Sequence, residues 1–490
     1  LPAGWLMQCL VENAVKALEL GDMMPANKSL LWGVVCVQVA LVVGPIYFAG
    51  PMFWAVPIFF IALSFLLFSV ERTLPLLLAV TIVLPSTVLS DLVLPGGVRL
   101  QEAFLLVACF FALVDWVYRR HLRISHTPAD GPVLFFLLVT CLSVGIGYLY
   151  GNEVSVIWRD ARFPLYYVVF FVVSYFVSGR SALRYYVPLL VILGLVVAAG
   201  YVLEFVGAID LSVGERFVRV ARLQGMVLPI ALLLVVCELV FAPRRWGRPL
   251  LLLLFIPIGL AFVLTVGRSM WAVFLIGLVC IAFMNGRLRG GNSRWRSAAL
   301  VVALLALLVG IVFSFQRLTG ASIGAQVFER SRTLVEYEEN VHVMGRIFSY
   351  AVALEASAEH PLLGHGQGKT LMLLNFNEEM LRFDWTRAWT IDSLYLTILV
   401  KMGVLGLIGF FWMYGRIMKL AWHAFHRSNN PHVRSFCAAS FALLMGMLAL
   451  GIGNASMING RFALVYAILF GMVAVIAREV SDGDAHAGTE

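Results

Sequence analysis

Arginines at the ends of apolar segments are the side chains in this sequence best suited to chemistry. Arg268 stands in a two-residue gap between apolar blocks, and other arginines gather in short polar connections. A guanidinium group keeps its charge and can bind two phosphate oxygens at once. Several of them converging on one cavity would suit a pyrophosphate, and the candidates are Arg159, Arg162, Arg216, Arg219, Arg222, Arg268 and Arg346.

A structural interpretation competes with this one for each arginine taken alone. The side chain could extend its charged end to the membrane interface, or pair with a nearby acid: Glu153, Asp160, Asp210 or Glu215. Arg268 is the strongest candidate for a ligand contact. Burying a charge toward lipid costs at least ~2.5–3.5 kcal/mol, so Arg268 must face a cavity, a partner or the headgroups.

Asp392 begins the apolar segment that follows the longest polar stretch of the chain. It could act as a general base that takes a proton from an acceptor hydroxyl, which requires a carboxylate within hydrogen-bond reach of the nucleophile. It could instead be an N-cap, because an acid is stabilised at the start of a helix. Lys401, two turns further along the same predicted helix, is expected to face a cavity or another polar group.

His365 is a second candidate acid or base, because it lies between two glycines in GHGQGKT. A turn histidine is the alternative interpretation. The string is similar to a phosphate-binding loop, but that pattern requires a glycine where Leu363 stands, so a nucleotide site is excluded. His342 and Arg346 begin a predicted loop helix, whereas His360 before Pro361 is expected to be structural.

The sequence predicts neither a metal site nor a cofactor. No HxxxH motif and no paired aspartates occur at the segment ends that carry the arginines. Neutralisation of an anion by arginine, without a divalent ion, is the working hypothesis. Six of the seven cysteines lie inside apolar blocks, which excludes a disulfide framework.

The composition places these residues in a membrane protein. Of the 490 residues, 61% are hydrophobic and 13% are charged, against roughly 45–50% and about 25% in soluble domains. We predict an all-α, polytopic transmembrane bundle of 12–14 spans, because apolar blocks near 20 residues recur. The candidate spans are 29–48, 52–70, 74–94, 101–118, 132–150, 163–178, 184–206, 223–242, 249–266, 269–285, 298–316, 392–415, 435–453 and 462–477.

The distribution of Lys and Arg predicts the orientation. The connections 119–131, 243–248, 286–297 and 416–434 hold 14 of these residues, and the short connections on the other side hold eight. The positive-inside rule therefore assigns the first set to the cytoplasm, so the net charge of +8 reflects topology and not nucleic acid binding. The predicted divisions are an interfacial amphipathic helix at 1–28, spans within 29–316, an exported loop at 317–391, spans within 392–478 and a frayed cytoplasmic tail at 479–490.

The exported loop is expected to be ordered, since structureless loops longer than ~15 residues are uncommon. Apolar spacing predicts one helix at 342–359 and a second, less regular one at 370–385. Pro361 and the glycines at 364, 366 and 368 predict a turn between them.

The sequence resembles the O-antigen ligase and polymerase superfamily. Its members share many spans, a large exported loop and the pattern R, about a dozen residues, then P-[LI]-[LF]-G-x-G, followed by H-N-x-x-L and G-x-x-G. The matching positions are Arg346, Pro361, Leu362, Leu363, Gly364, Gly366, Leu396, Gly403 and Gly406. Asp392 and Ser393 replace the usual His-Asn, which leaves an acceptor at the expected position of the base.

This resemblance implies a metal-independent inverting glycosyltransferase of the bacterial inner membrane with its active site in the periplasm. Its donor would be O-antigen on undecaprenyl pyrophosphate, and its acceptor a lipid A core sugar. Arg222 and Arg268 would stabilise the leaving group, and Asp392 or a neighbour such as His365 would activate the acceptor. A polymerase, a protein O-oligosaccharyltransferase and, from another class, an anion transporter are the alternatives; membrane lipids are expected partners and nucleic acid is not.

Overall fold

The structure is a computed structural model that describes residues 70–83, 93–94, 98–99, 102, 105, 109, 126–205, 223–242, 247–265, 267–289, 293–319, 341–377, 382–458, 460 and 462–487. The chain divides into two compact units. Leu1–Leu77 and Leu84–Arg119 form the first, and Leu78–Val83 and Arg120–Glu490 form the second. The predicted interfacial helix at 1–28 and the spans at 29–48 and 52–70 lie outside the described residues, except for residue 70.

The described part of the first unit contributes a short antiparallel pair, β1 (Val93–Leu94) and β2 (Val98–Arg99). Helix α4 (Val70–Val83) crosses the division between the units. The span predicted at 74–94 is therefore too long: its helix ends at Val83, and its last two residues form a strand. Pro and Gly residues at 95–97 separate the two strands, which is the composition of a tight turn.

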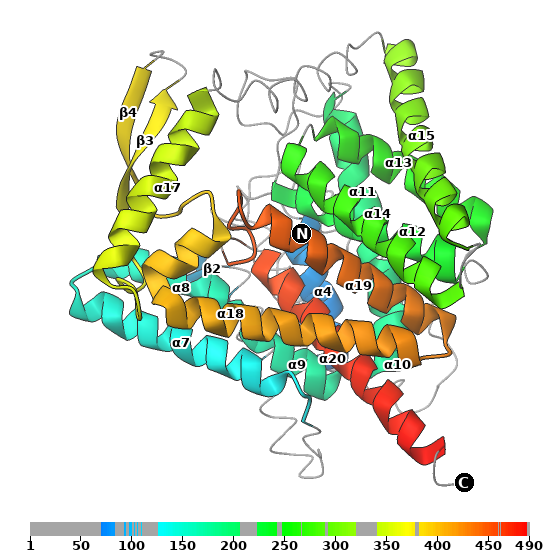
Figure 1. Ribbon diagram of the computed structural model, residues 1–490, viewed down its shortest axis with the longest axis horizontal. Coiled ribbons are helices and arrows are strands. Elements are labelled where there is room, and N and C mark those ends of the chain that lie inside the picture. Colours follow the sequence, from blue (N-terminus) through cyan, green and yellow to red (C-terminus); the bar gives the residue numbers. More distant parts are fainter. Residues whose placement is uncertain are drawn as a thin grey trace, which may run out of the picture. The chain divides into compact units, whose positions relative to one another are not determined.

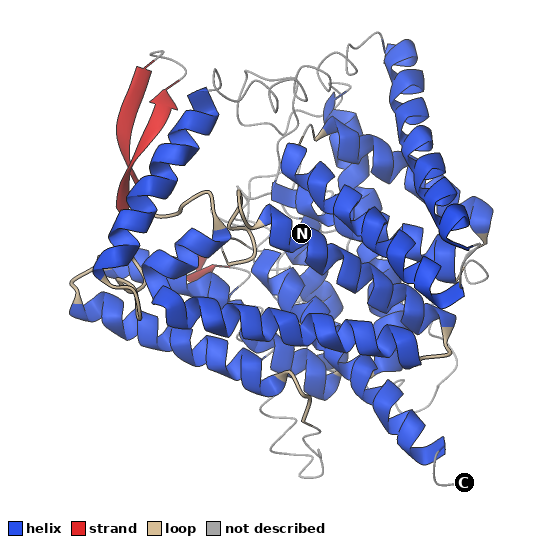
Figure 2. Cartoon of the chain, viewed as in Figure 1, coloured by secondary structure: helices blue, strands red, loops and turns tan. Residues whose placement is uncertain are grey.

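The second unit is built almost entirely of helices, which confirms the all-α prediction (Figure 2). They are α7 (Asp130–Leu149), α8 (Val154–Leu165), η1 (Tyr166–Val168), α9 (Val169–Phe176), α10 (Gly179–Ser181), η2 (Ala182–Tyr186), α11 (Val187–Phe205), η3 (Leu223–Met226), α12 (Val227–Phe241), α13 (Arg248–Leu264), α14 (Arg268–Arg289), α15 (Ser293–Thr319), α17 (Val341–Glu359), α18 (Leu394–Arg427), α19 (Pro431–Leu450) and α20 (Phe462–Ala487).

Six helices among the described residues are long and apolar enough to cross a membrane. They are Asp130–Leu149, Gly179–Phe205, Ser269–Leu288, Leu394–Arg427, Pro431–Leu450 and Phe462–Asp482, and three shorter apolar helices are Val227–Phe241, Arg248–Leu264 and Val301–Arg317. These segments confirm a polytopic membrane protein. The total of 12–14 spans stays a prediction, because most of the first 125 residues lie outside the described ranges.

Several predicted boundaries were wrong, mainly because helices continue beyond their apolar parts. Residues 154–162, expected in a connection, form α8, and the span expected at 163–178 is divided between the end of α8, η1 and α9. α18 continues to Arg427, and α20 continues through Ala487 into the polar tail. Hydropathy detects the apolar part of a helix and not its polar extension, because hydrogen bonding along the backbone does not require apolar side chains.

The core of this unit lies around α19 and α20. α19 packs against α12, α14 and α18, whereas α20 packs against α9 and α18. α19 and α14 approach closely at Gly446, where a Cβ atom would lie 2.6 Å from the carbonyl oxygen of Val273. Small residues permit such contacts between membrane helices, where packing replaces the hydrophobic effect as the driving force.

The second helix predicted within residues 317–391, at 370–385, was wrong. Here β3 (Leu371–Asn377) and β4 (Arg382–Ala388) pair as an antiparallel hairpin, with Leu371 opposite Ala388 and Asn377 opposite Arg382. Leu371 and Leu373 are buried while Met372 is exposed, which is the alternation of a strand. α17 confirms the first predicted helix and packs against β3, beside the hairpin in Figure 1.

α18 is interrupted at Gly403, whose φ of 63° and ψ of −165° lie in a region that is essentially restricted to glycine. The interruption leaves backbone N–H and C=O groups without helical partners. In apolar surroundings each unsatisfied group costs several kcal/mol, so other parts of the chain must provide the hydrogen bonds.

The loop of residues 361–370, here called the glycine loop, provides most of these bonds. Val404 N donates to Pro361 O (2.8 Å), Leu405 N to Leu362 O (3.2 Å), His365 N to Val400 O (2.8 Å), and Ser143 Oγ of α7 to Lys401 O (2.7 Å). A Cβ atom on Gly403 would lie 2.3 Å from Leu362 O, and one on Gly366 would lie 2.2 Å from Gly147 N of α7. The predicted turn is thus the element that completes the broken helix.

We predict that Gly403→Ala destabilises the protein, because it adds about 1–3 kcal/mol of backbone strain to a contact that has no room for Cβ. The midpoint of thermal unfolding in detergent should fall. Gly415→Ala is the matched control in the same helix, since no atom lies within 4 Å of its added Cβ. Equal midpoints for the two variants would contradict the role assigned to the break.

Candidate functional site

The junction between α17 and α18 brings together two residues that the sequence predicts to act on substrate. Arg346 Nε lies 3.3 Å from Asp392 Oδ2, and their side chains are 53% and 65% exposed. One turn after Arg346, the hydroxyl of Tyr350 shares its one proton between two carbonyl oxygens, Ile452 O at 2.8 Å and Asp392 O at 3.0 Å. α17 therefore holds the backbone at Asp392 while the carboxylate stays open to solvent.

Ser393 and not Asp392 is the N-cap of α18. Its Oγ accepts a hydrogen bond from Leu396 N at 3.4 Å, and Leu394 N donates to Gly451 O at 2.8 Å. The N-cap interpretation of Asp392 was therefore wrong. Because the neighbouring serine caps the helix, the carboxylate of Asp392 does not cap α18. It can therefore bind a ligand without uncapping the helix.

Arg159 of α8 lies against Trp389, three residues before Asp392. Its guanidinium carbon is 4.4 Å from the centre of the indole ring, a cation–π distance. Arg159 Nε is buried and has no hydrogen-bond partner in the described part of the chain. Arg162 follows one turn later in α8 and is half-buried. Sequence reasoning missed Trp389, because no local pattern indicates that its ring lies against one of the predicted arginines.

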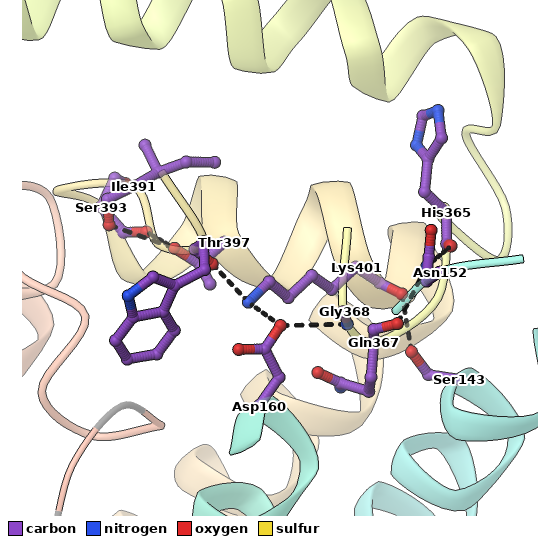
Figure 3. Close-up of polar contacts among 11 residues, drawn as sticks. Ser143, Asn152, Asp160, His365, Gln367, Gly368, Ile391, Ser393, Thr397 and Lys401 are labelled. Atoms are coloured by element: carbon purple, nitrogen blue, oxygen red, sulfur yellow. Dashed lines mark hydrogen bonds and ion pairs between the residues drawn. The ribbon is translucent and has the colours of Figure 1, made fainter. Parts of the chain in front are cut away.

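A buried ion pair joins α8 to α18 (Figure 3). Lys401 Nζ lies 2.6 Å from Asp160 Oδ2, with the two side chains 6% and 0% exposed. The same carboxylate oxygen accepts Gly368 N at 3.0 Å, and Lys401 Nζ also donates to Trp389 O at 2.7 Å. Lys401 thus faces polar groups, as predicted, and Asp160 pairs with this lysine instead of an arginine.

His365 belongs to a separate cluster. Its Nε2 lies 2.9 Å from Glu359 Oε2, and its ring meets that of His360 edge-on at 4.7 Å. In Figure 3 its imidazole points away from the Lys401–Asp160 pair. The hydrogen bond from His365 lowers the pKa of Glu359 and outweighs desolvation, which raises it; the charges of His365, Lys369 and His360 lower it further. None of the contacts described for His365 reaches Asp392.

The remaining predicted arginines are not placed by the structure. Arg216, Arg219 and Arg222 lie outside the described residues. Arg268 begins α14, as its position in a short gap predicts, but its side chain is not described. Within the described ranges, no group of three or more His, Cys, Asp or Glu side chains could hold a metal ion.

Comparison with known proteins finds a match to one family model. Residues 250–411 match the family model described as O-antigen ligase, which is about a third of the 490 residues. The matched segment extends from α13 into α18 and includes Arg268, Arg346, Asp392 and Lys401. No curated protein matches the chain.

We predict that Lys401→Met destabilises the protein by about 3–5 kcal/mol, because removal of one partner leaves a buried, uncompensated charge on the other. The midpoint of thermal unfolding in detergent measures this change. Lys419→Met, at an exposed position of the same helix, is the control and should have little effect.

The double variant Lys401→Met/Asp160→Asn separates the pair from the individual residues. Its loss of stability should be smaller than the sum of the two single losses, because the residues interact directly. Additive losses would show that Lys401 and Asp160 stabilise the fold independently, which is incompatible with the 2.6 Å contact.

Proposed function

From the match of residues 250–411, which supports membership of the O-antigen ligase superfamily, we propose that the protein is a lipopolysaccharide O-antigen ligase. It moves O-antigen glycan from undecaprenyl pyrophosphate to a sugar hydroxyl of the lipid A core. The observation that carries the proposal is the exposed Arg346–Asp392 pair within the matched segment. It presents an acceptor for a proton beside a group that binds phosphate.

In the proposed transfer, a carboxylate accepts the proton and guanidinium groups bind the leaving pyrophosphate. The acceptor oxygen attacks the anomeric carbon of the glycan and forms the new C–O bond with inversion. The C–O bond to the pyrophosphate breaks, and undecaprenyl pyrophosphate leaves with its electron pair. Asp392 takes the hydroxyl proton, and arginines offset the negative charge that develops on the leaving group.

Arg346 can serve both Asp392 and the donor. An ion pair between solvent-exposed groups contributes only about 0–1 kcal/mol, so exchanging the contact with Asp392 for pyrophosphate oxygens costs little. Arg159 is the next arginine that the geometry supports, since it lies against Trp389 and keeps a buried N–H without a partner among the described residues. Arg162, Arg216, Arg219, Arg222 and Arg268 complete the proposed pyrophosphate site.

The proposed location is the bacterial inner membrane, with the active site facing the periplasm. The asymmetric distribution of Lys and Arg supports this orientation. Six apolar helices in the described residues support a multi-pass chain, which is the setting that a polyprenyl-linked donor requires. The donor's tail would lie along apolar helices while its pyrophosphate reaches the arginines.

We predict that Asp392→Asn lowers the transfer rate by roughly 10²–10⁴-fold, the contribution of a positioned general base. The assay reconstitutes the full chain with undecaprenyl pyrophosphate-linked glycan and lipid A core, and follows the product on a gel. Asp392→Glu should retain part of the rate. Glu355→Gln, at an exposed acid of α17, is the control for charge and should transfer normally.

Full transfer by folded Asp392→Asn would contradict the role of Asp392 as the general base.

The product of the same assay shows which reaction the enzyme catalyses. If glycan lengthens on the polyprenyl carrier and none reaches lipid A, the protein is a polymerase, and attachment to a protein acceptor would identify an O-oligosaccharyltransferase. Transport of the anion without any transfer would contradict the enzyme proposal altogether.

We predict that a chelator leaves the transfer rate unchanged, because arginine side chains replace a divalent ion in the proposed site. The same reconstituted assay, run with excess EDTA and again with added Mg²⁺, measures this. An activity that is lost to EDTA and restored by Mg²⁺ would contradict the arginine-based mechanism.

A further inference from the structure

A cavity of about 600 Å³ opens where three candidate spans begin or end. Its lining includes residues of α10, which is labelled in Figure 1. Arg180 and Arg184 of α10 and η2 line it at the start of one span, His432 lines it at the start of α19, and Ile476 and Glu479 line it near the end of α20. A cavity at the ends of spans lies at a boundary between membrane and water.

This boundary is opposite the one that holds the Arg346–Asp392 pair. α19 begins at Pro431 beside the cavity and ends at Leu450. The next two residues, Gly451 and Ile452, accept the hydrogen bonds from Leu394 N and Tyr350 that hold the junction of α17 and α18. Twenty helical residues extend about 30 Å, which is the thickness of the hydrocarbon core.

Basic side chains outnumber acidic ones in the wall of the cavity, with Arg180 and Arg184 against Glu479. Arg180 and Arg184 are four residues apart, both are exposed, and neither has an ion-pair partner among the described residues. Arg184 lies 5.5 Å from the ring centre of Tyr185. The acid in the wall is Glu479, whose Oε1 accepts a hydrogen bond from Gly179 N at 2.6 Å.

The backbone that carries these arginines has unusual geometry. Arg184 belongs to η2, a π-helical segment of five residues between α10 and α11. Such segments are rare and occur frequently at functional sites, where they change the direction of a side chain relative to a regular helix. The π-helical segment therefore supports a binding role for this cavity.

The wall of the cavity is also apolar. Leu183, Val433, Ile476 and Val480 contribute to it beside the charged groups. A free anion would gain nothing from these side chains, whereas a lipid would place its acyl chains against them and its headgroup between the arginines. Guanidinium groups bind phosphate oxygens with two hydrogen bonds, and basic pockets between membrane helices suit anionic headgroups.

We propose that this cavity binds the phosphate headgroup of an anionic phospholipid through Arg180 and Arg184. The site is separate from the proposed transfer reaction and does not depend on it. Its effect is to anchor α11, α19 and α20 to one leaflet of the membrane, at the ends of the helices that lead to the opposite boundary.

The test measures binding of phosphatidylglycerol to the full chain in a zwitterionic detergent by native mass spectrometry, with phosphatidylcholine as the comparison lipid. We expect saturable binding of phosphatidylglycerol that Arg180→Gln/Arg184→Gln weakens by roughly 10- to 30-fold, since each basic residue near a charged membrane contributes about one factor of five. Val480→Glu, which adds a carboxylate to the wall, should weaken binding as well.

The matched control is Arg248→Gln/Lys419→Gln, which removes two exposed charges outside the cavity. It should bind phosphatidylglycerol within about twofold of the unmodified chain, as expected for a surface contribution that salt screens. Equal losses in the two double variants would overturn the proposal, because diffuse attraction would then explain the binding. Unchanged binding in Arg180→Gln/Arg184→Gln would overturn it too.

Inorganic phosphate separates a lipid site from a free-anion site. It should displace bound phosphatidylglycerol poorly, because it gains nothing from the apolar wall. If phosphate displaces phosphatidylglycerol at concentrations similar to those of the lipid, the cavity is a site for free anions and not for a phospholipid. Thermal unfolding of each variant in phosphatidylcholine checks the fold, so that a loss of binding by an intact variant is assigned to the cavity.

Discussion

The unsatisfied backbone of α18 at Gly403 is the constraint on which the rest of the described site depends. A helix that breaks among apolar neighbours must recover its hydrogen bonds from elsewhere. Here the glycine loop and Ser143 of α7 provide them. Since the loop follows α17 directly, satisfying the break also determines where α17 ends and hence where Arg346 lies.

The Lys401–Asp160 pair adds a second attachment at the same place. It connects α18 with α8 and, through Gly368 N and Trp389 O, with both ends of the segment that carries the hairpin. Two charges with so little exposure persist only when well paired and hydrogen-bonded. The result is a rigid support for the exposed pair of Arg346 and Asp392, which is the arrangement that the proposed transfer site would require.

Sequence patterns anticipated the parts of this arrangement that are local. α17, the turn after it and the position of Asp392 follow from apolar spacing, glycines and the start of a span. The hairpin did not follow, because Met372 and Leu374 are apolar as well as Leu371 and Leu373, so the alternation is hidden. The pairing of Asp160 with Lys401 joins residues 241 positions apart, and no local pattern identifies such partners. The break in α18 at Gly403 could not be predicted from the sequence either, since glycine also occurs in unbroken membrane helices.

The contacts between the glycine loop and α18 are made by main-chain atoms, which has a consequence for the length of the loop. Pro361 and Leu362 contribute only their carbonyl oxygens to these bonds, and Leu362 is 72% exposed, so the bonds do not depend on which side chains the two residues carry. The spacing between the carbonyls that meet Val404 and Leu405 and the amide that meets Val400 is not free. An inserted or deleted residue would shift this register, so the hydrogen bonds to α18 constrain the length of the loop.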